Sequence, residues 1–405
     1  MTSTVSFTVS TTRRWTILAL GVFAQAAQAV LVNGTAFLIP TLHEQHGMSL
    51  TQAGTLASAP VFGVVFALVA WGAIADRYGE RIVLTSGLAL ASVAVVAAAA
   101  TSSTVALAVF LAIGGACAAS ANAASGRVVV GWFPPHQRGL AMGIRQMSLP
   151  LGVAIAAMTM PLLARDHGIG WALAFPAAIC AIAAVACAAG IADPPRPDRI
   201  EAEAQGLLAN PYQQSSVLPR IHAASVLLVV PQYVVWTYAL VWLVTDVGWA
   251  EAAAGLVITA AQFLGAASRV AVGIWSDRVG SRLQPLRIVA VAVVGSMLAL
   301  GVVAATGSPL AVVMLVIASV TTVSPNGLAF TSVAEIAGPY WGGRALGVQN
   351  TCQFVAAAAV GPAFGAVITT VGFAGAFAIA AVAPAFAVPL VPQRLRGKSG
   401  TETSL

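Results

Sequence analysis

The sequence predicts an all-α polytopic membrane protein with 12 transmembrane helices in two pseudo-symmetric six-helix bundles. Three observations predict this class: 59% of the 405 residues are hydrophobic, only 8% are charged, and one sequence pattern occurs twice. An ordinary soluble domain has about 25% charged residues. Because a spanning helix needs about 20 apolar residues, the chain has room for about twelve spans and for no large extramembrane domain. This length excludes catalytic or nucleic-acid-binding modules of ordinary size.

Apolar runs between polar or helix-breaking segments define the expected spans. The first six are expected at residues 15–40, 50–75, 82–101, 104–132, 139–164 and 170–191. The second six are expected at residues 221–245, 251–275, 287–306, 309–334, 343–370 and 372–391. The first run follows Arg13 and Arg14 and has no small-residue cleavage site, so we interpret it as a retained span and not as a signal peptide.

A polar segment rich in proline and acidic residues separates the two sets of spans. It contains Pro194, Pro195 and Pro197, which are typical of a linker. The expected organisation is an N-terminal six-helix bundle at 1–192, a cytoplasmic linker at 193–219, a C-terminal six-helix bundle at 220–391 and a cytoplasmic tail at 392–405.

The basic residues are distributed unevenly between the two sides of the expected spans. Fifteen of the 19 Lys and Arg residues fall on the side of the N-terminus and one, Arg165, on the other side, while Arg127, Arg145 and Arg269 fall inside spans. Basic residues concentrate in cytoplasmic loops. We therefore predict a multi-pass protein of the inner (plasma) membrane, surrounded by the lipid bilayer, with both termini cytoplasmic. The net charge of +6 reflects this topology and does not indicate a nucleic-acid partner.

The residues that commonly bind metals or cofactors show no pattern of that kind. The four cysteines lie inside apolar runs without a Cys-x-x-Cys pair, and we expect them to act as small buried hydrophobic residues. The sequence also lacks G-x-S-x-G, H-E-x-x-H and a phosphate-binding loop. We therefore expect no cofactor, no metal site and no enzymatic activity.

A ten-residue segment occurs once after the second expected span and again after the eighth. The copies read GAIADRYGER at 72–81 and GIWSDRVGSR at 273–282. The identical positions are Gly72, Asp76, Arg77, Gly79 and Arg81 in the first copy and Gly273, Asp277, Arg278, Gly280 and Arg282 in the second. A Gly-x-x-x-Gly pair that begins at Gly139 also has a counterpart that begins at Gly343, and such pairs let two helices pack closely in lipid. The duplication predicts two related halves.

The duplicated loop resembles the signature of the major facilitator superfamily, and the resemblance covers essentially the whole chain. It implies secondary transport by alternating access, in which two bundles rock about one central site and the loop aspartates hold the cytoplasmic gate. Asp76 and Asp277 could serve this gate by facing a helix N-terminus or an arginine. Arg127 with Gly131 is similar to the family's Arg-x-x-x-Gly at the inner end of span four. We interpret Arg127 as a structural or gating residue, with substrate contact as the alternative.

Arg269 is the residue on which a substrate prediction can be built. It lies about seven residues, or roughly 10 Å, inside span eight, where a charge is costly unless it faces a cavity or a partner. Its counterpart in the first half is Leu68, which favours a role with the substrate over a role in the shared scaffold. The stretch 268–277 is similar to span eight of oxalate/formate antiporters and monocarboxylate porters, where such an arginine binds the substrate carboxylate. Leu68 departs from the nitrate porters, which have arginine in span two as well.

Further candidates for substrate contact are the remaining polar, charged or aromatic residues well inside the spans. Arg145, about four residues inside span five, could supply a second positive group. The others are Gln25, Gln28, Asn33, Asn122, Tyr233, Trp236, Gln262, Gln349, Asn350 and Gln353. For each of these residues, hydrogen bonding from helix to helix is an open alternative.

The charges inside the spans favour an anionic substrate. No Asp or Glu lies in the middle of an expected span, so the arginines there have no partner of opposite charge. We expect a monomeric secondary transporter that moves a small organic anion, a mono- or dicarboxylate, with a proton or a counter-anion as the possible coupling partner. The alternative is efflux of amphiphilic drugs or metabolites by an exporter of the same family. A proton-coupled drug antiporter, however, usually needs a buried acid.

Overall fold

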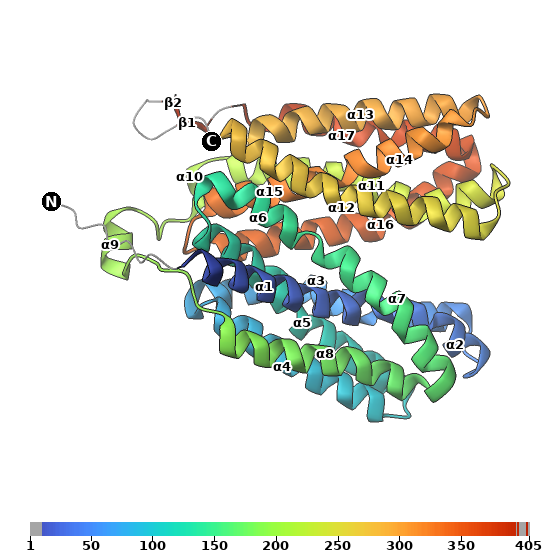
Figure 1. The fold of residues 1–405 in the computed structure, drawn as a ribbon, viewed down its shortest axis with the longest axis horizontal. Coiled ribbons are helices and arrows are strands. Elements are labelled where there is room, and N and C mark those ends of the chain that lie inside the picture. Colours follow the sequence, from blue (N-terminus) through green and yellow to red (C-terminus); the bar gives the residue numbers. More distant parts are fainter. Residues whose placement is uncertain (1–9, 394, 397–401, 404–405) are drawn as a thin grey trace.

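The computed structural model describes residues 10–393, 395–396 and 402–403, and nearly all of these residues are helical (Figure 1). The first half of the chain forms α1 (Thr11–Gly34), η1 (Thr35–Leu38), α2 (Ile39–Glu44), α3 (Leu50–Tyr78), α4 (Glu80–Ala100), α5 (Thr104–Trp132), η2 (Pro135–Gln137), α6 (Arg138–Arg145), α7 (Ser148–His167) and α8 (Ile169–Gly190). The segment between the halves contains α9 (Arg199–Ala204) and α10 (Pro211–Gln214).

The second half forms seven further helices of the described chain. They are α11 (Val217–Thr245), α12 (Glu251–Val279), α13 (Leu283–Ala305), α14 (Leu310–Val323), α15 (Pro325–Ala337), α16 (Gly342–Ala380) and α17 (Val382–Leu390). Beyond them, β1 (Leu395–Arg396) and β2 (Glu402–Thr403) pair as a short antiparallel ladder.

The helices form two bundles that lie side by side (Figure 1). One bundle contains α1, α3, α4, α5, α7 and α8, and the other contains α11 to α17. The helix α6 also belongs to the first half of the chain, contacts α1 and α5, and packs on α12 across the boundary between the two bundles. The start of α1 and the end of α17 lie at the same end of the molecule as α9 and α10, and we call this end the linker end (Figure 1).

The described residues contain 11 helical segments that are long and apolar enough to cross a membrane. The last of them, Gly342–Leu390, is 49 residues long, more than twice the length that a single span needs. Gly372 divides it, because its φ of 71° and ψ of 177° are not helical and are readily adopted only by glycine. With this division the segments correspond to the 12 predicted spans.

The helices of the two duplicated loops extend further than the sequence predicts. We expected the spans to end at residues 75 and 275, but α3 continues to Tyr78 and α12 to Val279. Asp76 and Asp277 therefore lie in the last turn of a helix and not in a loop. Both helices end at a glycine with positive φ, Gly79 at 95° and Gly280 at 67°, a common way for a helix to stop.

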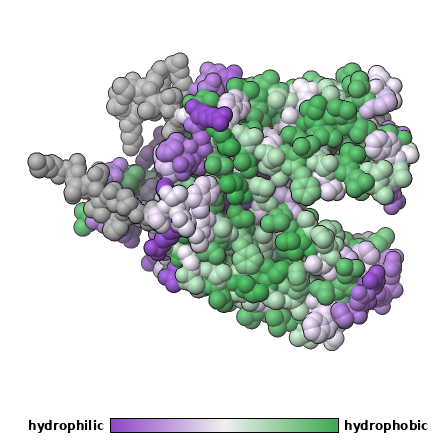
Figure 2. Space-filling model, in the orientation of Figure 1, coloured by the Kyte–Doolittle hydropathy of each residue, from purple (hydrophilic) through white to green (hydrophobic). Residues whose placement is uncertain are grey.

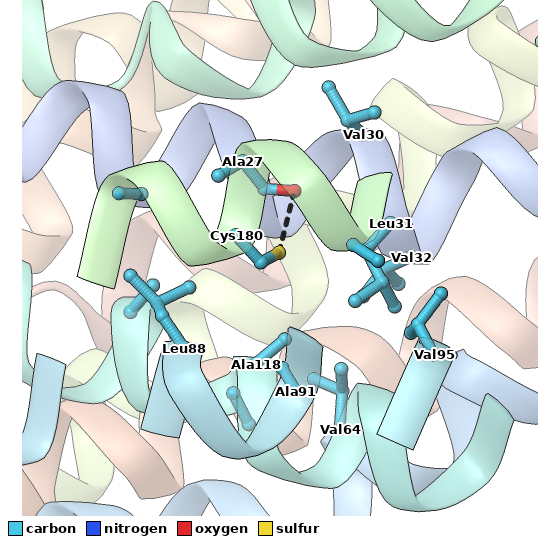
Figure 3. Packing of buried hydrophobic residues seen from close by; sticks show 14 of the residues in the cluster. Ala27, Val30, Leu31, Val32, Val64, Leu88, Ala91, Val95, Ala118 and Cys180 are labelled. Carbon is cyan, nitrogen blue, oxygen red and sulfur yellow. Dashed lines mark hydrogen bonds between the residues drawn. The ribbon is translucent and has the colours of Figure 1, made fainter. Parts of the chain in front are cut away.

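Small residues and tight apolar contacts form the core of the first bundle. Figure 3 shows Val64 of α3, Leu88 of α4 and Ala118 of α5 packed together. The thiol of Cys180 donates a weak hydrogen bond of 3.8 Å to the carbonyl of Ala27 in the same core. Cys180 and Cys187 are buried, as expected, whereas Cys117 and Cys352 are only partly buried.

Glycines bring α3 and α5 into backbone contact. A Cβ added at Gly63 would collide with the carbonyl oxygen of Ala112, and one added at Gly115 would collide with that of Pro60. Small residues promote this close approach in membranes, where burial away from water does not drive helices together. The two glycines therefore allow α3 and α5 to pack closely within the first bundle.

Candidate functional site

The first duplicated segment closes the linker end by a contact between the two bundles. The carboxylate of Asp76, at the end of α3, accepts hydrogen bonds from the backbone N–H groups of Gly343 (2.7 Å) and Arg344 (3.0 Å) at the start of α16. The side chains of Arg344 (Nε, 2.9 Å) and Arg127 (Nη1, 3.1 Å) also bind it. Because the first N–H groups of a helix lack partners inside the helix and carry partial positive charge, a buried carboxylate is stabilised there.

The second duplicated segment makes the same kind of contact. The two carboxylate oxygens of Asp277, at the end of α12, accept hydrogen bonds of 2.9 Å from the backbone N–H groups of Gly139 and Leu140 at the start of α6. Arg282 binds the same carboxylate through Nη1 at 2.5 Å. Arg282 also pairs with Glu335 of α15, which in turn binds Arg138 of α6.

Four glycines let these helix ends approach each other through their backbones. A Cβ added at Gly72 would collide with the carbonyl of Gly343, and one added at Gly343 would collide with the carbonyl of Gly72. In the same way, a Cβ added at Gly139 would collide with the carbonyl of Gly273, and one added at Gly273 would collide with the carbonyl of Gly139. The two aspartate contacts and the two glycine contacts together form what we call the linker-end gate.

Acidic residues that the sequence analysis did not select support the first half of the gate. Glu80, which is fully buried, binds Arg127 through Nε at 2.5 Å and Arg196 at 2.9 Å. Asp193 accepts a hydrogen bond of 2.8 Å from the backbone N–H of Arg81. In the sequence, only their position distinguishes Glu80 and Asp193: they are acidic residues near the ends of expected spans, and the middles of these spans contain no acidic residue.

The remaining residues of the duplicated segment differ in their surroundings. The guanidinium of Arg81 donates to the carbonyl of Ala188, while Arg77 is exposed and lies 5.3 Å from the ring centre of Tyr78. Arg278 is exposed, and it has no hydrogen-bond partner in the described part of the chain. Arginines at equivalent positions of the two copies therefore make different contacts.

The linker is tied to both bundles. Arg196 donates to the carbonyls of Ala75 and Asp76 at the end of α3, in addition to its pair with Glu80. On the other side, the hydroxyl of Tyr212 lies 2.9 Å from Nε2 of His222 in α11. Burial raises the pKa of the Tyr212 hydroxyl to about 12, so it keeps its proton at physiological pH.

A central cavity lies between the bundles and contains about 630 Å³ of space, open solvent included. Its lining residues are Gln25, Gln28, Asn33, Asn122, Gln146, Leu149, Val229, Gln232, Tyr233, Arg269, Asn326, Phe330, Asn350, Gln353 and Phe354. The surface is hollowed between the bundles at the end opposite the linker (Figure 2). The linker-end gate closes the other end.

The structure places most of the substrate candidates in this cavity, but four lie outside its lining. Arg145 is buried behind the wall, and Gln349 is fully buried with its Oε1 2.5 Å from Nδ1 of His222. Trp236 packs against Tyr233 with ring centres 5.4 Å apart, and Gln262 is partly buried on α12. The sequence analysis did not select Gln232 and Asn326, which line the cavity and bind each other at 2.9 Å.

Arg269 lines the cavity, and its guanidinium is only partly hydrogen-bonded. Its Nη1 donates a hydrogen bond of 2.8 Å to the backbone carbonyl of Gln146, which belongs to the opposite half of the chain. Its Nε is buried without a partner, and Nη2 makes no hydrogen bond within the described residues. The side chain is only 4% exposed, and no residue that lines the cavity is acidic.

Arg145 lies next to Arg269 in the same network. It is the last residue of α6 and lies outside the lining of the cavity, whereas the next residue, Gln146, belongs to the lining. The guanidinium donates to Ser125 (2.9 Å) and to the side-chain oxygen of Gln146 (3.0 Å). These partners are neutral, so Arg145 also places an uncompensated positive charge near the cavity.

Two helical bundles with a polar cavity between them, and a contact repeated in both halves at one end, are typical of a membrane transporter. Residues 18–359 match the family model described as Major Facilitator Superfamily. The chain belongs to this superfamily.

Relatives and solved structures agree with the assignment. An uncharacterized MFS-type transporter of Mycobacterium tuberculosis, Rv2994, is 49% identical over 94% of this chain and 85% of its own. A probable anion transporter 2 of the chloroplast of Oryza sativa subsp. japonica is 32% identical over 33% of this chain and 26% of its own. The proton:xylose symporter XylE has a TM-score of 0.75 at 14% identity, with 98% of both chains covered. This last similarity concerns the fold alone.

Proposed function

We propose that the protein is a secondary active transporter of a small organic anion, a mono- or dicarboxylate. The observation that carries the proposal is that Arg269 lines a cavity without an acidic lining residue and leaves its buried Nε without a partner in the described residues. A guanidinium edge matches the two oxygens of a carboxylate and stays charged at every physiological pH. The probable anion transporter that matches a third of the chain gives modest additional support.

The balance of charge supports an anionic ligand. Arg269 and Arg145 both bind only neutral groups in the described structure, and both are almost completely buried. A buried charge without a counter-charge is costly. A bound anion would supply the missing negative charge, whereas a cationic drug would add to the imbalance.

We also propose an orientation for the molecule. The uneven distribution of basic residues predicts that the linker end is cytoplasmic. The structure then represents an outward-open state, in which Asp76 and Asp277 hold the cytoplasmic gate closed. Gln25, Gln28, Asn122, Tyr233 and Asn350 are the proposed contacts for the rest of the ligand, and a proton or a counter-anion would couple transport.

The experiment that tests the proposal is a thermal-shift screen of the purified full-length protein. A ligand that binds only the folded state stabilises it by about 2.7 kcal/mol at 100 times its Kd. We expect mono- or dicarboxylates to raise the Tm of the native protein and to lose this effect in Arg269→Gln. Arg287→Gln is the matched control, because Arg287 lies outside the cavity and makes no hydrogen bond with the described residues.

Two outcomes would contradict the proposal. A carboxylate that stabilises Arg269→Gln as strongly as the native protein would remove Arg269 from the binding site. Stabilisation by cationic or neutral amphiphiles alone would replace anion transport by drug or metabolite efflux.

A further inference from the structure

The lining of the cavity is dominated by one functional group, the carboxamide. Nine of the 15 lining residues carry it, and the only charged group among them is the guanidinium of Arg269. The nine are Gln25, Gln28, Asn33, Asn122, Gln146, Gln232, Asn326, Asn350 and Gln353. A carboxylate needs only donors, so one arginine edge and a few N–H groups would suffice to bind it. The number of amides calls for a ligand with more polar groups than a carboxylate.

Three of these amides use their nitrogen within the protein and leave their oxygen free. Nδ2 of Asn33 donates to the carbonyl of Ala29 (3.2 Å), and Nδ2 of Asn350 donates to the carbonyl of Leu346 (2.8 Å). Nδ2 of Asn326 donates to Oε1 of Gln232 (2.9 Å). Their side-chain oxygens are therefore available as acceptors in the cavity wall.

Three other amides have the opposite arrangement. The side-chain oxygen of Gln146 accepts from Arg145 (3.0 Å), that of Asn122 from Gln25 (3.0 Å), and that of Gln232 from Asn326. Their side-chain nitrogens are left as donors. Gln28 and Gln353 make no side-chain hydrogen bond within the described residues, so each offers a donor and an acceptor.

We infer that the transported anion is a polyhydroxylated carboxylate, a sugar acid in chemical class. The inference rests on the proposed function, because Arg269 is taken to bind the carboxylate. Each hydroxyl group of such a ligand both donates and accepts a hydrogen bond, as the mixed lining requires. An ammonium group would also donate, but it would meet no carboxylate in this cavity.

Ligands without hydroxyl groups fit the lining poorly. An alkyl acid would displace water from the free amide oxygens and nitrogens and leave them without hydrogen-bond partners, which is unfavourable for each group. A site built to hydrogen-bond hydroxyl groups can therefore reject a deoxygenated analogue by orders of magnitude. This physical difference supplies the test.

The test compares three kinds of ligand on the purified full-length protein by calorimetry or thermal shift. The first is a panel of aldonates and uronates that includes gluconate, the second is hexanoate, which has the chain length and charge of gluconate without its hydroxyls, and the third is glucitol, which has the hydroxyls without the charge. We expect at least one sugar acid to bind at least tenfold more tightly than hexanoate and glucitol. We expect Gln28→Leu to reduce this preference, and Gln284→Leu, an exposed glutamine outside the cavity, to leave it unchanged.

Each remaining outcome decides against one of the two proposals or against both. Equal affinity for hexanoate and the best sugar acid would overturn the inference and leave anion transport intact. Equal affinity for glucitol and the best sugar acid would overturn the anionic substrate itself. Binding of none of the three kinds would overturn the inference, and the carboxylate screen with Arg269→Gln would then decide on anion transport separately. If Gln28→Leu keeps both the native Tm and the full preference for the sugar acid, the amides of the lining do not recognise the ligand.

Discussion

Asp76 and Gly343 lie 267 residues apart in sequence, yet the carboxylate of Asp76 accepts a hydrogen bond of 2.7 Å from the backbone N–H of Gly343. This contact joins a helix end of one bundle to a helix start of the other. Asp277 makes the equivalent contact with Gly139 at 2.9 Å. Opening of the linker end has to break both contacts, so they are direct targets for variants that change the conformational equilibrium.

Replacement of one gate aspartate should slow transport without removing the substrate site. Asp76→Asn keeps the size of the side chain but removes its charge. It also replaces one acceptor oxygen by an NH2 group, which cannot accept hydrogen bonds from the N–H groups of Gly343 and Arg344. The lost interaction with the helix start is worth up to about 2 kcal/mol in a partly buried site. We expect a lower transport rate in proteoliposomes and a ligand Kd within about threefold of the native value.

The linker provides the control for this variant. Asp198→Asn also neutralises an aspartate at a helix start, but Asp198 caps the exposed helix α9, where the cap binds Glu201 of the same helix. It should transport at the native rate. A native rate for Asp76→Asn as well would show that the contact does not control the conformational change.

A methyl group at the glycine contact should destabilise the closed gate. In Gly139→Ala the new Cβ would collide with the backbone carbonyl of Gly273, which cannot move as a side chain could. Overpacking of this kind costs about 1 to 3 kcal/mol. We expect a fall in Tm relative to Gly295→Ala, where no atom lies within 4 Å of the added Cβ and removal of a helical glycine is slightly favourable. Equal Tm values for the two variants would contradict the tight contact.

Loss of the linker arginine should leave a buried acid partly unpaired. Arg196→Gln removes one of the two arginines that bind Glu80, which has no exposed surface. Hydrogen bonds to charged groups contribute about 1.5 to 3 kcal/mol, so the free energy of unfolding should fall by that order. Arg199→Gln changes an exposed arginine of the same linker and should stay within about 0.5 kcal/mol of native. Comparison of the Tm values of both variants measures the difference.

Patterns in the sequence predict the fold and the positions of the gate residues, but not which residues meet. Hydropathy predicts the spans because the lipid bilayer requires every span to be apolar. The repeat identifies Asp76 and Asp277 as equivalent residues of the two halves. The repeat does not reveal that Asp76 binds the start of α16, since that contact joins unlike helices of different halves. The positive φ of Gly372 separates the last two spans next to the boundary that the sequence predicts between residues 370 and 372.

The cavity was harder to predict than the gate, because its lining depends on the direction of single side chains. Arg145 and Gln146 are neighbours in sequence, but only Gln146 lines the cavity. Gln349 and Asn350 divide in the same way on α16, where successive residues point about 100° apart. Without the path of the backbone, helical spacing alone does not decide between such neighbours.

The glycine contacts of the gate have a consequence for the cost of each transport cycle. Where Gly72 meets Gly343 and Gly139 meets Gly273, the bundles touch through main chain that is already fixed in helices. Immobilising a long side chain costs up to about 2 kcal/mol in lost rotamer freedom, and glycine has no side chain to immobilise. Separation and return of the bundles therefore leave conformational entropy nearly unchanged at these four positions, so the gate can close repeatedly without an ordering penalty there.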